Sequence, residues 1–182
     1  MSDEVLARQG WSSADLEANH WGKLSDDQLV ALRARNRSMW RRTLWIALPL
    51  PVASLAFAIY ATVAWNIAPL FVLPIIGFLT ITPLIAFVGI RVKKVAADLE
   101  AGKVVKVSGR IEKYFVNTAT GQAALRIDGE HLESFGPQSD PRWKEVRRVL
   151  VDVYDRQREV RAYFLPTSRL VIAAEDLTRS NE

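Results

Sequence analysis

The stretch AWNIAPL, residues 64–70, lies near the middle of 48 consecutive residues without charge, from Thr43 to Ile90. A single bilayer crossing needs ~20 apolar residues, because a rise of ~1.5 Å per residue must cover a hydrocarbon core ~30 Å thick. This block is too long for one crossing and suits two. Asn66 is polar and Pro69 suits the first turn of a new helix, so we expect the chain to turn there. The sequence therefore predicts a transmembrane hairpin with helices over 43–65 and 68–90.

Two other interpretations of the charge-free block remain open. The first is a helical hairpin buried inside a large globular core, which is disfavoured because neither half of the block has a polar face. The second is a secretory signal peptide, which would be shorter, nearer the start of the chain and followed by a small-residue cleavage site. The membrane hairpin fits the length and composition best.

The charged residues are confined to the two flanks of this block. Each flank is basic where it adjoins the block. Basic residues close to membrane ends are retained in the cytoplasm, so we expect an inner (plasma) membrane protein with both termini cytoplasmic. Tryptophan favours the membrane interface, and an interface belt of Trp40, Trp45 and Trp65 fits this orientation. The basic flanking residues are Arg33, Arg35, Arg37, Arg41, Arg42, Arg91, Lys93 and Lys94.

These eight basic residues have two compatible interpretations. They could contact anionic lipid headgroups, at ~1 kcal/mol each near the surface, or they could serve only to set topology. Nucleic-acid binding is the weaker alternative, because the cluster is short and lacks interleaved aromatic residues in a folded platform. We therefore expect membrane lipids as partners and no nucleic acid.

Residues 1–42 are expected to form a cytoplasmic helical segment, and residues 91–102 a helical neck after the membrane. In LSDDQLVALR, Ser25 and Gln28 have the spacing of a capping box, in which each side chain accepts a hydrogen bond from the other's backbone N–H. The sequence therefore predicts a helix that begins just after Ser25 and becomes basic before the apolar block.

Residues 103–177 change to the two-residue periodicity of strands, and residues 178–182 form a tail. Five short strands are predicted, with a hairpin at Asp128-Gly129, the strongest short hairpin signal in the chain. A helix is predicted from Pro141, with Trp143 as a core anchor. The expected fold class is thus an α+β membrane protein: a two-helix transmembrane hairpin plus a small antiparallel β-barrel-like (OB/SH3-like) cytoplasmic domain with one inserted helix.

Two stretches of the chain resemble the two ends of uncharacterised bacterial two-pass membrane proteins. They are EANHWGKLSDDQLVALR before the block and VRAYFLPTSRLVIAAEDL near the end. That family implies an N-terminal cytoplasmic helix, a hairpin and a small β domain, and it implies no activity. The strand VVKVSGRIEK alone is similar to the small barrel of NfeD-like membrane proteins. The resemblance implies topology and fold, not chemistry.

The sequence offers little material for catalysis. Its two histidines are His20 and His131, and no phosphate loop, dinucleotide turn or acidic metal cluster is present. His131 and Glu133 would share a strand face, but zinc takes three or four ligands, so we expect no metal and no cofactor. We expect a non-enzymatic adaptor, scaffold or accessory subunit of a membrane complex, which binds a protein partner or forms a homo-oligomer. The alternative is a transport- or channel-associated subunit, with Pro49, Pro51, Pro74 and Pro83 bending its helices.

Overall fold

The computed structural model of the 182-residue chain describes residues 12–65, 72–117, 122–134 and 141–178. The chain divides into two compact units. The sheet unit comprises residues 1–31 and 97–182, and the helical unit comprises residues 32–96. Each unit is described by itself below.

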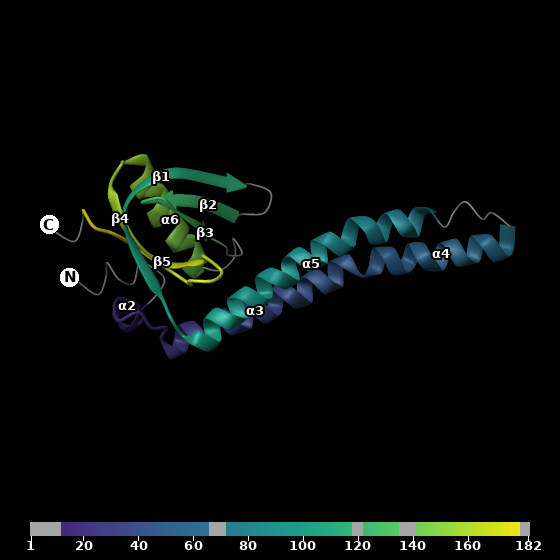
Figure 1. Cartoon of the computed structure of the whole chain (residues 1–182), viewed down its shortest axis with the longest axis horizontal. Coiled ribbons are helices and arrows are strands. Elements are labelled where there is room, and N and C mark those ends of the chain that lie inside the picture. Colours follow the sequence, from purple (N-terminus) through teal and green to yellow (C-terminus); the bar gives the residue numbers. More distant parts are fainter. Residues whose placement is uncertain (1–11, 66–71, 118–121, 135–140, 179–182) are drawn as a thin grey trace. The chain divides into compact units, whose positions relative to one another are not determined.

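The sheet unit contains one antiparallel sheet of five strands in the order β3-β2-β1-β4-β5 (Figure 1). The long strand β1 pairs with two neighbours, because its first half lies against β4 and its second half against β2. Val107 is opposite Ala162 on β4, and Ile111 is opposite Ile127 on β2. The strands are β1 (Val105–Asn117), β2 (Gln122–Ile127), β3 (Glu130–Ser134), β4 (Glu159–Phe164) and β5 (Val171–Asp176).

The two outer strands of the sheet meet at one point. Glu133 on β3 forms a parallel bridge with Leu170, and the Glu133 N–H donates to the carbonyl oxygen of Arg169 at 2.9 Å. This contact joins the two edges of the sheet, so that its five strands curve into a partly open barrel. The largest fully buried apolar side chains of the sheet unit include Ile127, Leu132, Phe164 and Ile172.

Helix α6 (Pro141–Asp155) follows β3 and packs on the sheet, chiefly against β5. It begins at Pro141, whose missing N–H would be unpaired at the first helical position in any case. Trp143, Val146, Leu150 and Val153 are buried, and their spacing of three and four residues places them on one helix face. The predicted helix start and the predicted role of Trp143 as a core anchor are both confirmed.

The N-terminal part of the sheet unit consists of α2 (Ser13–His20) and the beginning of α3 (Asp26–Ala47). The capping box predicted at α3 is present: Gln28 N–H donates to Ser25 Oγ at 3.1 Å, and Ser25 N–H donates to Gln28 Oε1 at 3.2 Å. Backbone hydrogen bonds then join this segment to the residues after α5. Leu24 donates to Gly102, and Val104 donates to Gly22.

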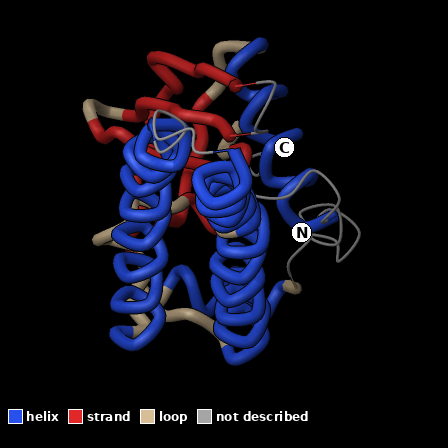
Figure 2. The backbone as a smooth tube through the Cα atoms, turned by 90° about the vertical axis from the view of Figure 1, so that its right-hand side faces the viewer, coloured by secondary structure: helices blue, strands red, loops and turns tan. Residues whose placement is uncertain are grey.

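The helical unit is built from the rest of α3, from α4 (Pro49–Trp65), and from α5 (Val72–Ala101) as far as Ala96. Its helices run side by side in Figures 1 and 2. The side-chain amide of Asn36 donates to the carbonyl oxygen of Val92 at 3.1 Å, and Gly89 lies against the ring of Trp40. The contact position on α5 falls from Val92 to Gly89 as the position on α3 rises from Asn36 to Trp40, so α3 and α5 are antiparallel.

The membrane hairpin predicted from residues 43–90 is wrong. Across the parts of the chain that the structure describes, none of the helices combines the length and the apolar character that crossing a bilayer demands. The first predicted span is divided at Leu48: residues 43–47 end α3, and α4 has 17 residues, or ~26 Å at ~1.5 Å each. The described part of the second lies in α5, which continues from Val72 without a break into the charged residues of the expected neck.

This correction extends to the expectations that depended on the hairpin. The membrane part of the fold class, the two-pass description and the inner-membrane location with two cytoplasmic termini are all wrong, because no described helix supplies the required crossing. The α+β character remains, as a five-stranded antiparallel sheet with helices. The turn expected at Asn66 and Pro69 lies outside the described residues.

Candidate functional site

What distinguishes the helical unit is that it carries basic residues but no acidic residue. The helical unit contains eight of the chain's 24 Lys and Arg residues and none of its 20 Asp and Glu residues, so its formal charge is +8. The remaining 16 basic and 20 acidic residues give the sheet unit a formal charge of −4. A net charge of +4 for the whole chain therefore conceals two units of opposite sign.

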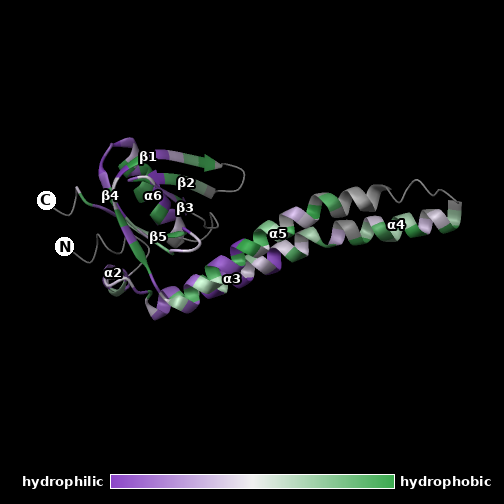
Figure 3. Cartoon of the chain, viewed as in Figure 1, coloured by the Kyte–Doolittle hydropathy of each residue, from purple (hydrophilic) through white to green (hydrophobic). Residues whose placement is uncertain are grey.

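The eight basic residues predicted from the sequence come together on two neighbouring helices. The contacts of Asn36 with Val92 and of Trp40 with Gly89 place the α3 cluster beside the α5 cluster. In Figure 3 the hydrophilic colours are concentrated on this part of α3 and α5 and are sparser along α4. Six of these side chains are exposed, namely Arg33, Arg37, Arg41, Arg42, Lys93 and Lys94, while Arg35 and Arg91 are half-buried.

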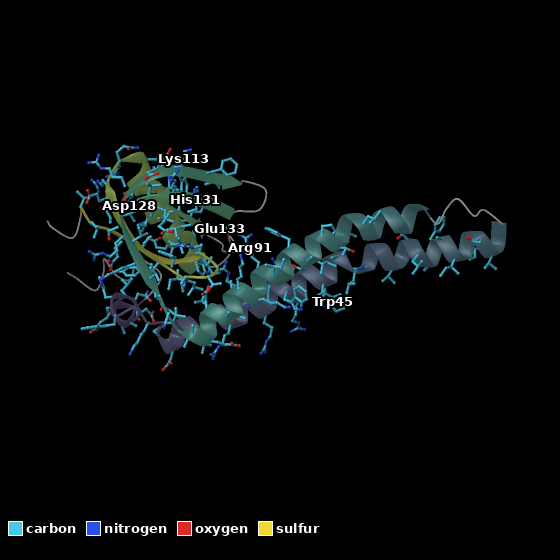
Figure 4. The ribbon with its side chains drawn as sticks, in the orientation of Figure 1. Trp45, Arg91, Lys113, Asp128, His131 and Glu133 are labelled. Atoms are coloured by element: carbon cyan, nitrogen blue, oxygen red, sulfur yellow. The ribbon has the colours of Figure 1, made fainter. Side chains whose placement is uncertain are left out.

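Arg91 differs from the other basic residues because its guanidinium carbon lies 5.3 Å from the centre of the Phe87 ring. Such stacking of a cation on an aromatic face is favourable, and more so where water is partly excluded. Burial lowers the pKa of Arg91 to about 10, because desolvation disfavours its charged form. Figure 4 labels Arg91 on α5. The residue remains charged at neutral pH, but part of its surface is already used within the chain.

A second feature of the helical unit is the exposure of its large apolar side chains. On α4, the described residues that are sheltered are all small: Ala58 is buried, and Ser54 and Thr62 are half-buried, whereas Ala53, Ala56 and Ala64 are exposed. The large apolar residues are exposed, and Val63 reaches 83%. The exposed large apolar residues of α4 and the helical-unit part of α5 are Val52, Leu55, Phe57, Ile59, Tyr60, Val63, Leu79, Phe87 and Ile90.

The predicted tryptophan belt is not supported, because the membrane it would flank has no described crossing. Trp40 is half-buried against Gly89 and therefore packs within the helical unit. Trp45, labelled in Figure 4, is 76% exposed near the end of α3. The side chain of Trp65 lies outside the described part of the structure.

In the sheet unit, four residues from α2, β4 and β5 form a polar cluster. The hydroxyl of Tyr163 on β4 donates to Glu175 Oε2 on β5 at 2.9 Å, and the ring nitrogens of His20 on α2 lie 3.1 Å from the same hydroxyl. His20 Nε2 lies 3.4 Å from Glu175 Oε1, and Arg161 Nη1 lies 3.6 Å from Glu175 Oε2. The cluster therefore attaches α2 to the surface of the barrel.

The electrostatics of this cluster favour a protonated Tyr163. Burial raises the pKa of Tyr163 well above its usual range, and the negative charge of Glu175 and its hydrogen bond raise it further. A tyrosine that keeps its proton at neutral pH serves as a hydrogen-bond donor rather than as a base. The arrangement is therefore a structural link, and it lacks the activated nucleophile that covalent catalysis needs.

Reasoning from the sequence missed this cluster, because His20 and Tyr163 are 143 positions apart and no local pattern brings them together. One local signal was available. Ser12 and Asp15 form a capping box at the start of α2, with Asp15 N–H donating to Ser12 Oγ at 3.2 Å and Ser12 N–H donating to Asp15 Oδ2 at 2.8 Å. Recognising it would have placed His20 in the last turn of that helix.

The two candidate metal ligands of the sequence analysis both lie on β3. His131 and Glu133 alternate along one strand, and Figure 4 labels both. Among the residues that the structure describes, no group of three or more histidine, cysteine, aspartate or glutamate side chains is placed to hold a metal ion.

Comparison with known proteins assigns neither a family nor a function to the chain. No family model matches the chain, and neither a curated protein nor a solved structure was found to be significantly similar to it. The resemblance to two-pass membrane proteins therefore stays a prediction, and function has to be argued from the chain's own residues.

Proposed function

We propose that this protein is a self-associating scaffold. In this proposal the exposed apolar faces of α4 and α5 pack against the same faces of a second copy, and the sheet units are brought together as a result. The observation that carries the proposal is the burial pattern on α4: among its described residues the sheltered side chains are the small Ser54, Ala58 and Thr62, while the large apolar ones are exposed.

Physical reasons support a protein partner for this surface. A helix that is apolar on all sides is normally buried in its working state, and large contiguous apolar patches mark interaction sites. Helix α4 has 17 residues without a charged side chain, and Val52, Ile59 and Val63 repeat at seven and four residues along one stripe. Such a stripe suits helix–helix packing in a bundle.

The composition of the surface favours a second copy as the occupant. A face without charges has no electrostatic complement to select a different protein, whereas a two-fold dimer needs only a self-complementary patch. A face two helices wide and as long as α4 measures ~26 by ~20 Å, or roughly 500 Å², since a helix with side chains is ~10 Å across. One such face packed against the same face of a second copy would bury roughly 1,000 Å² in total, which is about the minimum for a specific interface.

Single-cysteine crosslinking tests this proposal, because the chain contains no cysteine that would interfere. Val52→Cys, Ile59→Cys and Val63→Cys introduce thiols along the exposed stripe of α4. Under oxidising conditions we expect disulfide-linked dimers from at least one of these variants, namely the one whose position lies nearest the two-fold axis, because a disulfide joins residues whose Cα atoms are within ~7 Å. Phe115→Cys is the matched control, because Phe115 is an apolar residue on β1 that is 69% exposed and lies outside the helical unit. It should remain monomeric on a non-reducing gel.

A second measurement identifies the occupant. Light scattering of the full chain should give a dimer or larger oligomer, and Val63→Glu should shift it toward monomer while Phe115→Glu should not. A chain that is monomeric at all concentrations would contradict the proposal. A monomer that floats with phosphatidylcholine vesicles would show that lipid, and not a second copy, covers these faces.

A further inference from the structure

We infer that the helical unit binds a ligand that carries two or more phosphate groups, through a row of four cations on one side of the α3–α5 pair. The four-cation row consists of Arg33, Arg37 and Arg41 on α3 and Lys93 on α5. This inference is independent of self-association, because it concerns the part of α3 and α5 that lies beyond the apolar faces.

The helical periodicity assigns the cations to sides of the pair. Asn36 and Trp40 face α5, and each residue along an α-helix turns the side-chain direction by ~100°. Arg37 and Arg41 each come one residue after the contact positions Asn36 and Trp40, and Arg33 comes one residue after the buried Leu32, one turn earlier. All three therefore lie about 100° to one side of the contact. Their spacing of four residues places them in a single stripe.

Lys93 joins the same side from the other helix. It comes one residue after Val92, whose carbonyl oxygen contacts Asn36. In an antiparallel pair of right-handed helices, the residues that follow the contact positions on both helices point to the same side of the pair. Because position 92 is level with position 36, Lys93 lies at a height between Arg33 and Arg37.

Residues that precede the contact positions point to the opposite side of the pair. Arg35 comes just before Asn36, and Arg91 comes just before Val92, so both lie across the pair from the four-cation row. These two residues are the half-buried ones, and Arg91 stacks on Phe87. The basic cluster is therefore two-sided: one side is used within the chain, and the other is exposed.

The four-cation row carries uncompensated charge within the described part of the helical unit. All four side chains are exposed, and none of them forms an ion pair with a residue that the structure describes. The helical unit itself offers no acidic partner, because residues 32–96 contain neither Asp nor Glu. Four like charges on one side repel one another, and an anion that bridges them removes this repulsion.

The geometry favours phosphate over a single carboxylate. Arginine presents a planar fork of donors that binds phosphate oxygens in pairs, and three of the four cations are arginines. Successive arginines of the stripe are ~6 Å apart along the helix axis, at ~1.5 Å per residue. At this spacing, successive arginines can bind neighbouring phosphate groups, so the stripe has room for at least two. A free polyphosphate or a polyphosphorylated lipid headgroup supplies such groups.

Calorimetric titration of the full chain with sodium tripolyphosphate tests the inference. We expect binding that weakens with added salt, because exposed charges are screened. The double variant Arg33→Gln/Arg37→Gln should raise the dissociation constant at least about tenfold. The control Arg42→Gln/Lys94→Gln removes the same charge from two exposed residues outside the row and should raise it less than about threefold. Far-ultraviolet circular dichroism should show both variants folded.

A parallel titration identifies the source of the phosphates. Phosphatidylcholine vesicles that contain a small fraction of phosphatidylinositol bisphosphate are titrated with the same variants. Row-dependent binding to tripolyphosphate alone indicates a free polyphosphate, and row-dependent binding to vesicles alone indicates a lipid headgroup; either result supports the inference. Equal losses in the two double variants would show a response to bulk charge and overturn it. Absence of binding to both probes would overturn it as well.

Discussion

The carboxylate of Asp98, near the end of α5, accepts a hydrogen bond from the backbone N–H of Ser168 at 2.7 Å. Its other oxygen accepts from the N–H of Thr167 at 2.9 Å. Both donors belong to the turn between β4 and β5, and Asp98 is only 1% exposed. A single buried side chain thus attaches the end of a long helix to the closing hairpin of the barrel.

We expect Asp98→Asn to lower the free energy of unfolding by about 1–3 kcal/mol. The amide loses the charge that strengthens both hydrogen bonds, and one of its two polar atoms is a donor facing an N–H. Urea denaturation measures the change. Glu100→Gln, an exposed neighbour on the same helix, is the control and should change stability by less than about 0.5 kcal/mol. Equal effects of the two variants would contradict a role for the turn contacts.

Tyr163 should give the sheet unit a distinct dependence on alkaline pH. Its pKa is raised in the folded chain, chiefly by burial and then by Glu175, so the folded state holds this proton more tightly than the unfolded state does. The resulting stability is complete below the unfolded pKa of about 10 and is lost as pH rises above it. One such group contributes a slope of at most ~1.4 kcal/mol per pH unit.

Tyr163→Phe should remove this slope, and denaturation curves between pH 9 and pH 11 would measure it. Tyr114→Phe provides the comparison, because burial also raises the pKa of Tyr114, so the double variant should lose both contributions. If wild type and Tyr163→Phe lost stability in parallel above pH 10, the buried hydroxyl would not be the titrating group.

Shortening a buried side chain of α6 should lower the free energy of unfolding. Leu150 is fully buried where α6 packs on the sheet. We expect Leu150→Ala to lower the free energy of unfolding by about 2–5 kcal/mol, because it removes buried methyl groups and leaves a cavity. Arg148→Ala, on the exposed side of the same helix, should cost less than about 0.5 kcal/mol, since its pair with Glu145 is a surface one. Comparable losses would mean that helix propensity, and not packing, dominates.

The hairpin between β2 and β3 should depend on its glycine. Asp128 and Gly129 have φ values of 48° and 76°, in the left-handed region that a two-residue hairpin turn of this kind requires. Gly129→Ala should destabilise the chain by about 1–2 kcal/mol, because a Cβ is disfavoured there. Asp128→Asn should be nearly neutral, since asparagine adopts this conformation readily. Thermal unfolding of both variants checks the prediction, and a neutral Gly129→Ala would contradict it.

Several local elements could be read from the residues alone. The Asp128-Gly129 hairpin, the start of α6 at Pro141 and the Ser25–Gln28 capping box are each set by side chains within a few positions of one another. The reason is physical: turn geometry, a missing proline N–H and a capping hydrogen bond act over short stretches of backbone. The basic residues of the candidate site were also identifiable, because charge is a property of composition.

Other features were decided only by tertiary structure. The charge-free block predicted two long spans, but where its helices break depends on how the chain packs, and α4 starts anew at Pro49. His20 and Tyr163 are 143 positions apart and meet only because α2 lies on the barrel. The two-sided division of the cations likewise depends on Asn36 reaching Val92. Composition and local pattern determined which residues this protein carries and many of its short elements; the contacts between distant segments decided which of those residues face one another.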